Sequence, residues 1–366
     1  MTVNPLSLPT DPERAALFRD ARGTAPFFDS RLKLWVVLDH EKVAELLLDG
    51  RLAVPEVDAA LATVEQRYDI GLPNLRWAAK ELPLVINGAA HRRARSGIAK
   101  LLSADRKSGG AWREPVRRLV RDAFAAAGPV EAVRGLLLPI VNLAFASLTQ
   151  IDVSFEPFTL TRVFDHYTSY RQLVAVEQHI ADLRGRLREA GIPDESIGAH
   201  AALVILGRDS LLSSLAEGVL DFVLNCRGHR LNDTSVAPPR LFGGVAIAER
   251  LVTTPFEFAG ITFEKEQRIR LYLQGFSYLE SETERLAMFG VSEHSCLGRA
   301  LALEVWSVLA SGLREVALTV QSVDFAYERH SIFTMPRFIN LALVSAHDSD
   351  THDAPSDPGG DSDRHG

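Results

Sequence analysis

The sequence has few cysteines and no long apolar run, and both absences restrict what the protein can be. Its 366 residues contain two cysteines, Cys226 and Cys296, which excludes a small secreted fold held together by several disulfides. No stretch approaches the roughly 20 apolar residues that a membrane-spanning helix needs. The first residues also show no basic segment followed by an apolar one. We therefore expect a cytoplasmic protein with no membrane segment.

The sequence also lacks an excess of positive charge. Its formal net charge is -7, and residues 347–366 contribute -5 of this through six aspartates and one arginine. The remaining charge of -2 is not that of a nucleic-acid binder or a polybasic membrane protein. Because residues 347–366 are mostly Asp, Ser, Gly, Pro and His, they have nothing to bury. We expect a single domain over 1–346 and a disordered acidic tail over 347–366.

Hydrophobic patterning predicts a helix-rich chain with small β-sheets near its two ends. The expected helices cover 41–49, 91–102, 112–127, 130–149, 161–190, 197–225 and 301–316. The expected extended segments cover 34–38, 250–263 with a turn at Ala259-Gly260, 268–273 and 325–344. This combination predicts a mainly α fold with small β-sheets, of the α+β class.

The most apolar of these helices, 197–225, carries Arg208 and Asp209 at its centre. A helix that is apolar on all sides is buried, and burying charges is costly unless they are paired or functional. Two readings stay open, a structural Arg–Asp pair and a functional site.

The clearest chemical signal is the segment 289–302, in which Cys296 stands just before an amphipathic helix. The N–H groups at a helix N-terminus stabilise a thiolate, and Gly298 leaves room for a flat, bulky group to approach the backbone. A thiolate in this position could be a metal ligand or a nucleophile. The alternative is a buried free cysteine without a chemical role.

This segment resembles the heme-binding loop of the cytochromes P450, Phe-x-x-Gly-x-His/Arg-x-Cys-x-Gly followed by Leu-Ala and Glu. The matching residues are Phe289, His294, Cys296, Gly298, Leu301, Ala302 and Glu304. The resemblance implies a shortened P450-like fold that binds heme b, with Cys296 as the iron ligand. Ser292 departs from it, because it occupies a glycine position. A serine there must either adopt a glycine-like backbone or bend the loop differently.

Other segments match the same family in the same order. Residues 87–95 resemble its Asp-Pro-Pro-Glu-His-Thr-Arg-Leu-Arg segment, and 250–261 resembles its hairpin that begins with arginine. The resemblance implies that four side chains, His91, Arg95, Arg250 and His294, face the heme propionates. Buried propionates need such charge-assisted partners. Surface charges and a satisfied histidine at a helix start are the alternatives.

The segment 206–210 falls where the family's central helix carries an acid and a hydroxyl that relay protons to the iron. Asp209 and Ser210 retain those two groups, and Arg208 adds an unusual cation. The resemblance therefore implies that Arg208, Asp209 and Ser210 shape proton delivery.

The family's Glu-x-x-Arg helix is the largest departure. It would fall on 237–240, where two prolines argue against a helix, or on 232–235, and neither register keeps the glutamate. The segment between 273 and 289 also lacks the family's usual meander. The resemblance thus leaves in doubt how the cysteine loop is held.

We expect a heme-thiolate oxidoreductase, monooxygenase- or peroxygenase-like, that acts on a small hydrophobic or natural-product intermediate. A ferredoxin-type protein would be the electron donor unless peroxide serves as oxidant. The expected pocket contributors lie within 54–85 and 155–178. Two alternatives remain: a catalytically inactive P450-like accessory protein that activates a partner enzyme, and a heme enzyme with a non-oxidative reaction. Neither nucleic acid nor a membrane is an expected partner.

Overall fold

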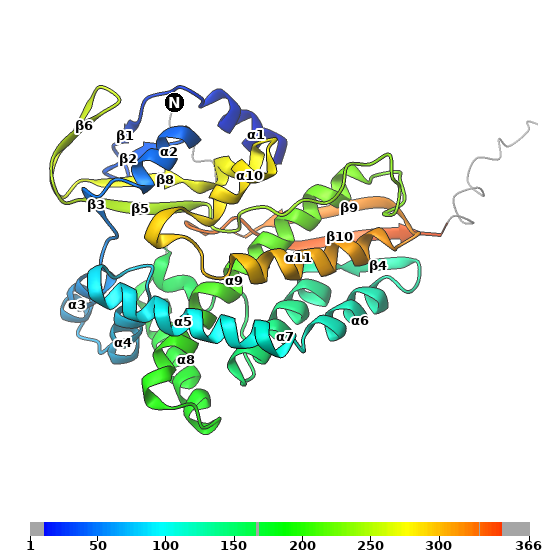
Figure 1. The fold of residues 1–366 in the computed structure, drawn as a ribbon, viewed down its shortest axis with the longest axis horizontal. Helices are drawn as coiled ribbons and strands as arrows, with labels where there is room; N and C mark the ends of the chain where they lie inside the picture. The colour runs from blue at the N-terminus through cyan, green and yellow to red at the C-terminus, as the bar shows by residue number, and fades with distance from the viewer. Residues whose placement is uncertain (1–10, 166–167, 329, 346–366) are drawn as a thin grey trace, which may run out of the picture.

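Most of the helices lie together below the small β-sheets in the view of Figure 1. The computed structural model describes residues 11–165, 168–328 and 330–345, so the expected acidic tail and the expected domain end at 346 lie outside the described residues. In the described part of the chain, no helix is both long and apolar enough to cross a bilayer. The architecture is the mainly α class with small sheets that the sequence predicts.

The larger sheet gathers strands from both ends of the chain. Its five strands have the order β1-β2-β8-β5-β3, with β2 parallel to β8 and the other pairs antiparallel. These strands are β1 (Phe27–Asp29), β2 (Leu34–Val37), β3 (Leu52–Ala53), β5 (Ile247–Val252) and β8 (Arg268–Tyr272). The sheet therefore fixes the N-terminal part of the chain to the segment that precedes the cysteine loop.

Two smaller antiparallel sheets complete the β-structure. One has the order β4-β10-β9, with β4 at Gly128–Glu131, β9 at Thr319–Tyr327 and β10 at Pro336–Val344. The other is a hairpin of β6 (Phe256–Phe258) and β7 (Ile261–Phe263). Its turn residues Ala259 and Gly260 have φ of 52° and 75°, as a two-residue hairpin turn requires. The predicted turn is thus confirmed.

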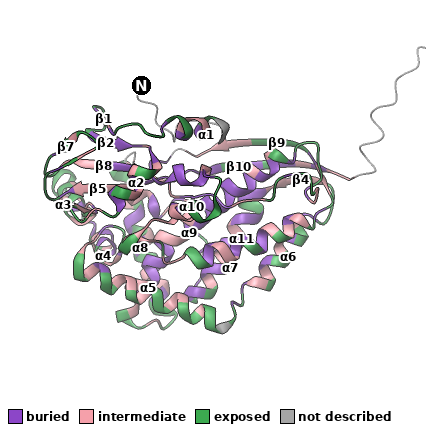
Figure 2. Ribbon diagram, turned by 45° about the horizontal axis from the view of Figure 1, so that its top comes forward, coloured by how far each residue is buried: buried purple, intermediate pink, exposed green. Residues whose placement is uncertain are grey.

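The helices surround one long central helix. Helix α9 (Asp194–Asn225) has 32 residues and is buried along nearly its whole length, as Figure 2 shows. The other α-helices are α1 (Asp11–Asp20), α2 (His40–Leu47), α3 (Val57–Tyr68), α4 (Pro73–Glu81), α5 (Gly88–Ser108), α6 (Arg113–Ala123), α7 (Leu138–Thr149), α8 (Tyr170–Glu189), α10 (Glu282–Arg285) and α11 (Arg299–Arg314).

Two glycines let neighbouring helices approach the backbone of α9 closely. A Cβ atom on Gly207 would lie 2.8 Å from the Phe145 ring of α7. A Cβ atom on Gly218 would lie 2.7 Å from the Trp306 ring of α11. Because both contacts are too short for a side chain, any larger residue would push α7 or α11 away from the central helix.

Two of the predicted helices are wrong in extent. The predicted helix over 161–190 is divided into a 3₁₀ turn, Thr161–Phe164, and α8. Helix α8 begins at Tyr170 because Ser169 and Gln172 cap each other's backbone N–H groups. The predicted helix over 130–149 begins later, with a π-helical turn at Val133–Leu137, because 128–131 pairs with β10 as a strand.

The chain between α9 and β5 contains no helix, although all of residues 226–246 are described. The expected Glu-x-x-Arg position therefore lies on no helix in either register, 232–235 or 237–240. Side chains hold this segment instead. Arg314 donates to the carbonyls of Asp233 and Val236 at 2.6 and 2.8 Å, and the Gly244 N–H donates to the Ser214 hydroxyl at 2.9 Å.

A buried ion pair joins three elements that are far apart in the sequence. Arg14 of α1 lies 3.3 Å from the Glu217 carboxylate of α9, and both side chains are almost completely buried. The Tyr327 hydroxyl of β9 donates to the same carboxylate at 3.3 Å, and the Arg14 guanidinium lies 4.4 Å from the Tyr327 ring centroid. This cluster fixes α1 and β9 to the central helix.

Replacing Arg14 by Met should lower the free energy of unfolding by about 3 kcal/mol, because the buried Glu217 carboxylate loses an ion-pair partner. The double variant R14M/E217Q should recover part of this loss, since it removes the buried negative charge as well. Urea denaturation measures both. The control is Arg117→Met, whose partner Glu114 lies 3.4 Å away on an exposed surface, and it should cost less than about 0.5 kcal/mol. Equal losses at Arg14 and Arg117 would contradict this account.

Candidate functional site

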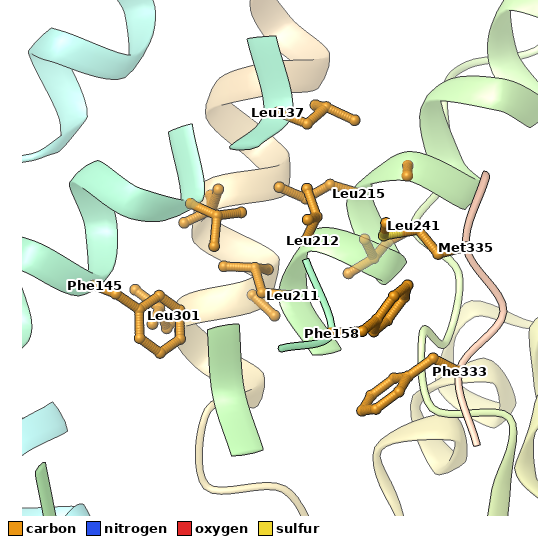
Figure 3. Packing of buried hydrophobic residues seen from close by; sticks show 14 of the residues in the cluster. Leu137, Phe145, Phe158, Leu211, Leu212, Leu215, Leu241, Leu301, Phe333 and Met335 are labelled. Atoms are coloured by element: carbon orange, nitrogen blue, oxygen red, sulfur yellow. The ribbon is translucent and has the colours of Figure 1, made fainter. Parts of the chain in front are cut away.

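A cavity of about 250 Å³ lies between the central helix and the loop that precedes α11. Residues of α5, α7, α9, β5 and the loop line it, and most of these residues are apolar. The apolar lining includes Leu84, Ile98, Phe145, Phe164, Leu203, Leu206, Val245, Leu273, Leu301, Ile332 and Phe333. Figure 3 shows Phe145 and Leu301 at one end of this region. A mostly apolar space of this kind suits a small organic ligand.

Cys296 forms part of the cavity wall at the start of α11. Its backbone N–H donates to the Phe289 carbonyl at 2.7 Å, which closes the loop around it, and Gly298 is the N-cap of α11. The Cys296 side chain is exposed, and the surface that it exposes lines the cavity. Burial raises the pKa of the Cys296 thiol, whereas the Gly298 N–H and the charge of Arg95 oppose this rise. A metal ion at the sulfur would displace the proton.

Basic side chains gather on the same cavity. Arg95, Arg250 and His294 line it, and the His91 ring packs on the His294 ring with centroids 4.3 Å apart. Burial lowers the pKa of Arg250 to about 10. Burial and the nearby Arg250 lower the pKa of His294 to about 4, so that this imidazole is neutral at pH 7. This end of the cavity is therefore electropositive.

Two of these basic side chains lack an ion-pair partner among the described residues, whereas His294 lies 3.8 Å from the Glu293 carboxylate. Arg250 is 5% exposed, and no carboxylate lies within ion-pair distance of it in the described chain. His91 is 2% exposed, and its Nε2 atom has no hydrogen-bond partner among the described residues. Because buried polar groups are normally hydrogen-bonded, these groups indicate the place of an anionic ligand.

Ser292 adopts the backbone conformation of a glycine. Its φ is 62°, in the left-handed region, and its hydroxyl accepts the N–H of Glu293. Of the two outcomes expected for a serine at this position, the loop thus takes the glycine-like one. Gly290, two residues earlier, also has a positive φ of 74°.

The three residues of α9 that the sequence singles out do not share one environment. Ser210 lines the cavity, and its hydroxyl donates to the Leu206 carbonyl. Arg208 and Asp209 do not line the cavity, and they form a buried ion pair at 2.6 Å. The fold thus contains the buried Arg–Asp pair that the structural interpretation of these two charges predicts. A role of either in catalysis stays a prediction.

The structure brings together most of the predicted site. Seven of the predicted residues line the one cavity: Arg95, Ser210, Arg250, Phe289, His294, Cys296 and Gly298. His91 reaches it through His294.

No protein-family model matches the sequence, and a search of curated proteins finds no match. Solved structures do match over nearly the whole chain. Epothilone B-bound cytochrome P450epoK has a TM-score of 0.71 at 18% identity, with 93% of this chain and 99% of that chain covered. CalO2 has a TM-score of 0.71 at 14% identity, with 94% and 99% covered. The fold is that of the cytochromes P450. A thermophilic cytochrome P450 from Sulfolobus tokodaii also matches, with a TM-score of 0.64 at 13% identity and 90% and 99% covered.

The residues around the cavity fit the heme that the P450 fold implies. A cysteine sulfur faces the space, as an iron ligand must. Gly298 has no side chain there, and a Cβ atom would lie 3.7 Å from the sulfur. The unpartnered His91 Nε2 and the Arg250 guanidinium would receive the propionate carboxylates. The residues present thus suit both the iron and the propionate edge of a heme.

Several residues that line the cavity were not predicted from the sequence. The expected pocket segments are confirmed in part, because Pro83, Leu84, Thr161 and Phe164 line the cavity. Ile332 and Phe333, from the connection of β9 and β10, were not predicted. No local sequence signal identifies them, since only the tertiary fold brings this connection to the cavity.

Replacing Ser292 by Gly should stabilise the protein by up to about 1 kcal/mol, because a side chain at positive φ is strained. Ser295 provides a matched control in the same loop, since its φ of -59° suits any residue. Ser295→Gly should therefore leave the melting temperature unchanged or lower it. If both glycine variants shifted the melting temperature equally, the Ser292 backbone would not be the source of strain.

Proposed function

We propose that the protein is a heme-thiolate oxidoreductase that acts on a small hydrophobic compound, with Cys296 as the proximal iron ligand. One observation carries the proposal. A single cavity unites a cysteine at a helix N-terminus with the buried Arg250, which has no carboxylate partner among the described residues, and it adjoins the unpartnered His91 Nε2. The P450 fold around this cavity supports the same conclusion.

Each residue around the cavity has a distinct role in this proposal. Cys296 would ligate the iron, and Phe289 would position it by accepting its N–H. Gly298 would leave space for the heme plane. His91, Arg95, Arg250 and His294 would bind the propionates, with the two arginines neutralising their charge and the two histidines donating hydrogen bonds. The thiolate-ligated heme would supply oxygen activation, because the thiolate donates electron density to the iron.

The part of the cavity away from these basic groups would bind the substrate. Leu203 and Leu206 of α9 face it together with Phe164 and Phe333, and none of these side chains can hydrogen-bond. Ser210 offers a hydroxyl there, which would hold a proton or a water molecule. We therefore propose an apolar substrate, and a natural-product intermediate agrees with the epothilone bound by one structural neighbour.

An excess of positive charge in helices α5 and α6 supports an acidic electron donor of the ferredoxin type. Residues 88–123, which form α5 and α6, contain ten Lys or Arg and three Asp or Glu, a net charge of +7. The whole chain has a net charge of -7, so the positive charge is concentrated in this region. Such a region accelerates the encounter with an acidic partner. Peroxide is the alternative oxidant if no donor protein is required.

The absorption spectrum of the purified protein, reduced under carbon monoxide, tests the proposal. We expect a red-shifted Soret band typical of thiolate ligation, and Cys296→Ala should abolish it. Cys226→Ala is the matched control, since this buried cysteine at the end of α9 lies outside the cavity, and it should keep the band.

Failure to take up heme, even after reconstitution, would contradict the proposal. It would favour the accessory-protein alternative, which the lack of a helix over 226–246 also favours. An identical spectrum in Cys296→Ala would instead show that another residue ligates the iron.

Arg250→Gln should weaken heme retention about tenfold, because a buried charge-assisted hydrogen bond to a carboxylate is lost. Heme transfer to apomyoglobin measures the dissociation rate. The control is Arg268→Gln on the neighbouring strand β8, because Arg268 pairs with Glu249 outside the cavity. An equal loss in the two variants would show that Arg250 acts only through the stability of the sheet.

A further inference from the structure

The segment that connects α7 to α8 forms a roof over the cavity without any α-helix. We call residues 153–164 the roof segment. Its regular structure is a single 3₁₀ turn, Thr161–Phe164, and Thr161 and Phe164 line the cavity. A segment with so little backbone hydrogen bonding must be held by other contacts.

The Arg208–Asp209 pair of α9 supplies those contacts. One oxygen of the Asp209 carboxylate accepts the Phe158 N–H at 2.9 Å and the Thr161 hydroxyl at 3.0 Å. Its other oxygen accepts Arg208 Nη1 at 2.6 Å. Arg208 in turn donates to the Phe155 carbonyl of the roof segment and to Asn142 of α7 at 3.0 Å. The pair is thus bonded to the roof segment at three residues.

The roof segment is strained where Asp209 holds it. Phe158 has a φ of 62°, a conformation that costs a bulky residue on the order of 1 kcal/mol. The Phe158 ring packs on Phe333, with centroids 5.5 Å apart, and Phe333 lines the cavity. Figure 3 shows Phe158 and Phe333 as neighbours, with Leu211 and Leu212 of the central helix nearby. The bond from Asp209 to the Phe158 N–H therefore also fixes this aromatic wall.

Asp209 is poorly placed to carry protons to the cavity. Its side chain is 2% exposed and does not line the cavity, and both of its oxygens already accept hydrogen bonds. Turning the carboxylate toward Ser210 would break its bonds to Phe158 and Thr161. It would also leave the Arg208 charge buried without this partner, which is costly.

We propose that Arg208 and Asp209 are positioning residues that clamp the roof segment onto α9 and so determine which ligands fit the cavity. This inference rests on the proposed function only in that the cavity takes a ligand. Thr161, Phe164 and Phe333 then set the size limit, and Ser210, rather than Asp209, is the polar group of this turn of α9 that faces the ligand.

Asp209→Asn and the double variant R208Q/D209N separate a clamp from a proton relay. The amide introduced by Asp209→Asn keeps one oxygen for Phe158 and Thr161, but its nitrogen would face the buried Arg208 cation. In the double variant two neutral amides meet, so the bonds to Phe158 and Thr161 persist without any acid, whereas the bond of Arg208 to Phe155 is lost. The matched pair Thr161→Val and Thr159→Val tests the roof itself, since Thr159 lies on the same segment and is not a partner of Asp209.

Two measurements test whether Arg208 and Asp209 hold the roof segment in place. Hydrogen exchange of peptides covering 153–164 needs no heme, and it should be about tenfold faster in Asp209→Asn and in Thr161→Val than in the parent. In heme-loaded protein, the ratio of the dissociation constants of imidazole and 4-phenylimidazole, measured from the Soret shift, should change about fivefold in the same variants. The double variant should recover part of both effects, because the bonds to Phe158 and Thr161 are kept while that of Arg208 to Phe155 is lost, and Thr159→Val should change neither.

The proposal would be overturned if Asp209→Asn left both the hydrogen exchange of 153–164 and the ratio of the two dissociation constants unchanged. It would also be overturned if the double variant showed the same changes in both measurements as Asp209→Asn. If Asp209→Asn does not fold, the double variant and Thr161→Val decide by the same criteria. If neither the parent nor any variant takes up heme, the proposed function fails while hydrogen exchange still decides on the clamp. The two failures are therefore distinguishable.

Discussion

The structure depends on one constraint, which is that a 32-residue helix is buried on nearly all sides and still carries charged and hydroxyl groups. Each of these groups must find a partner in another element, since an unpaired polar group in a core is costly. Glu217 finds Arg14 of α1, and Asp209 finds the roof segment. Ser213 donates to the Thr334 carbonyl beside β10. The polar residues of α9 thus decide which segments surround it.

The same constraint explains how the cysteine loop stays in place without the helix that the family resemblance implies. Residues 226–246 return from α9 to β5 without a helix, held by Arg314 of α11 and by Ser214 of α9. Helix α11, which begins just after Cys296, packs on Gly218 of α9 through Trp306. The cysteine is therefore positioned through the contact of α11 with α9 and through its own loop hydrogen bond to Phe289. A separate supporting helix is not required for this geometry.

The sequence predicts the basic half of the site better than the walls around it. Cys296, Gly298 and His294 belong to a contiguous motif, and Arg250 begins a hairpin with a recognisable turn, so local patterns are enough to find them. The roof segment has no such pattern. The helix predicted over 161–190 includes its last four residues, whereas its long-range bonds to α9 hold it in another conformation and the cap at Ser169 decides where α8 starts. The orientation of Asp209, away from the cavity, likewise depends on which neighbour α9 meets at that turn.

The two ends of the cavity affect the stability of the folded protein in opposite ways. At the apolar end, burial of Leu203 and Phe333 in the fold favours folding without any ligand. At the other end, Arg250 and His91 are buried beside the partly buried His294, and burial lowers the pKa of all three, which means that their charged forms are destabilised. An anionic ligand removes that cost, whereas the unfolded chain has no such site. Ligand binding and folding are therefore linked, and the protein gains more stability the more tightly this basic end holds its anion.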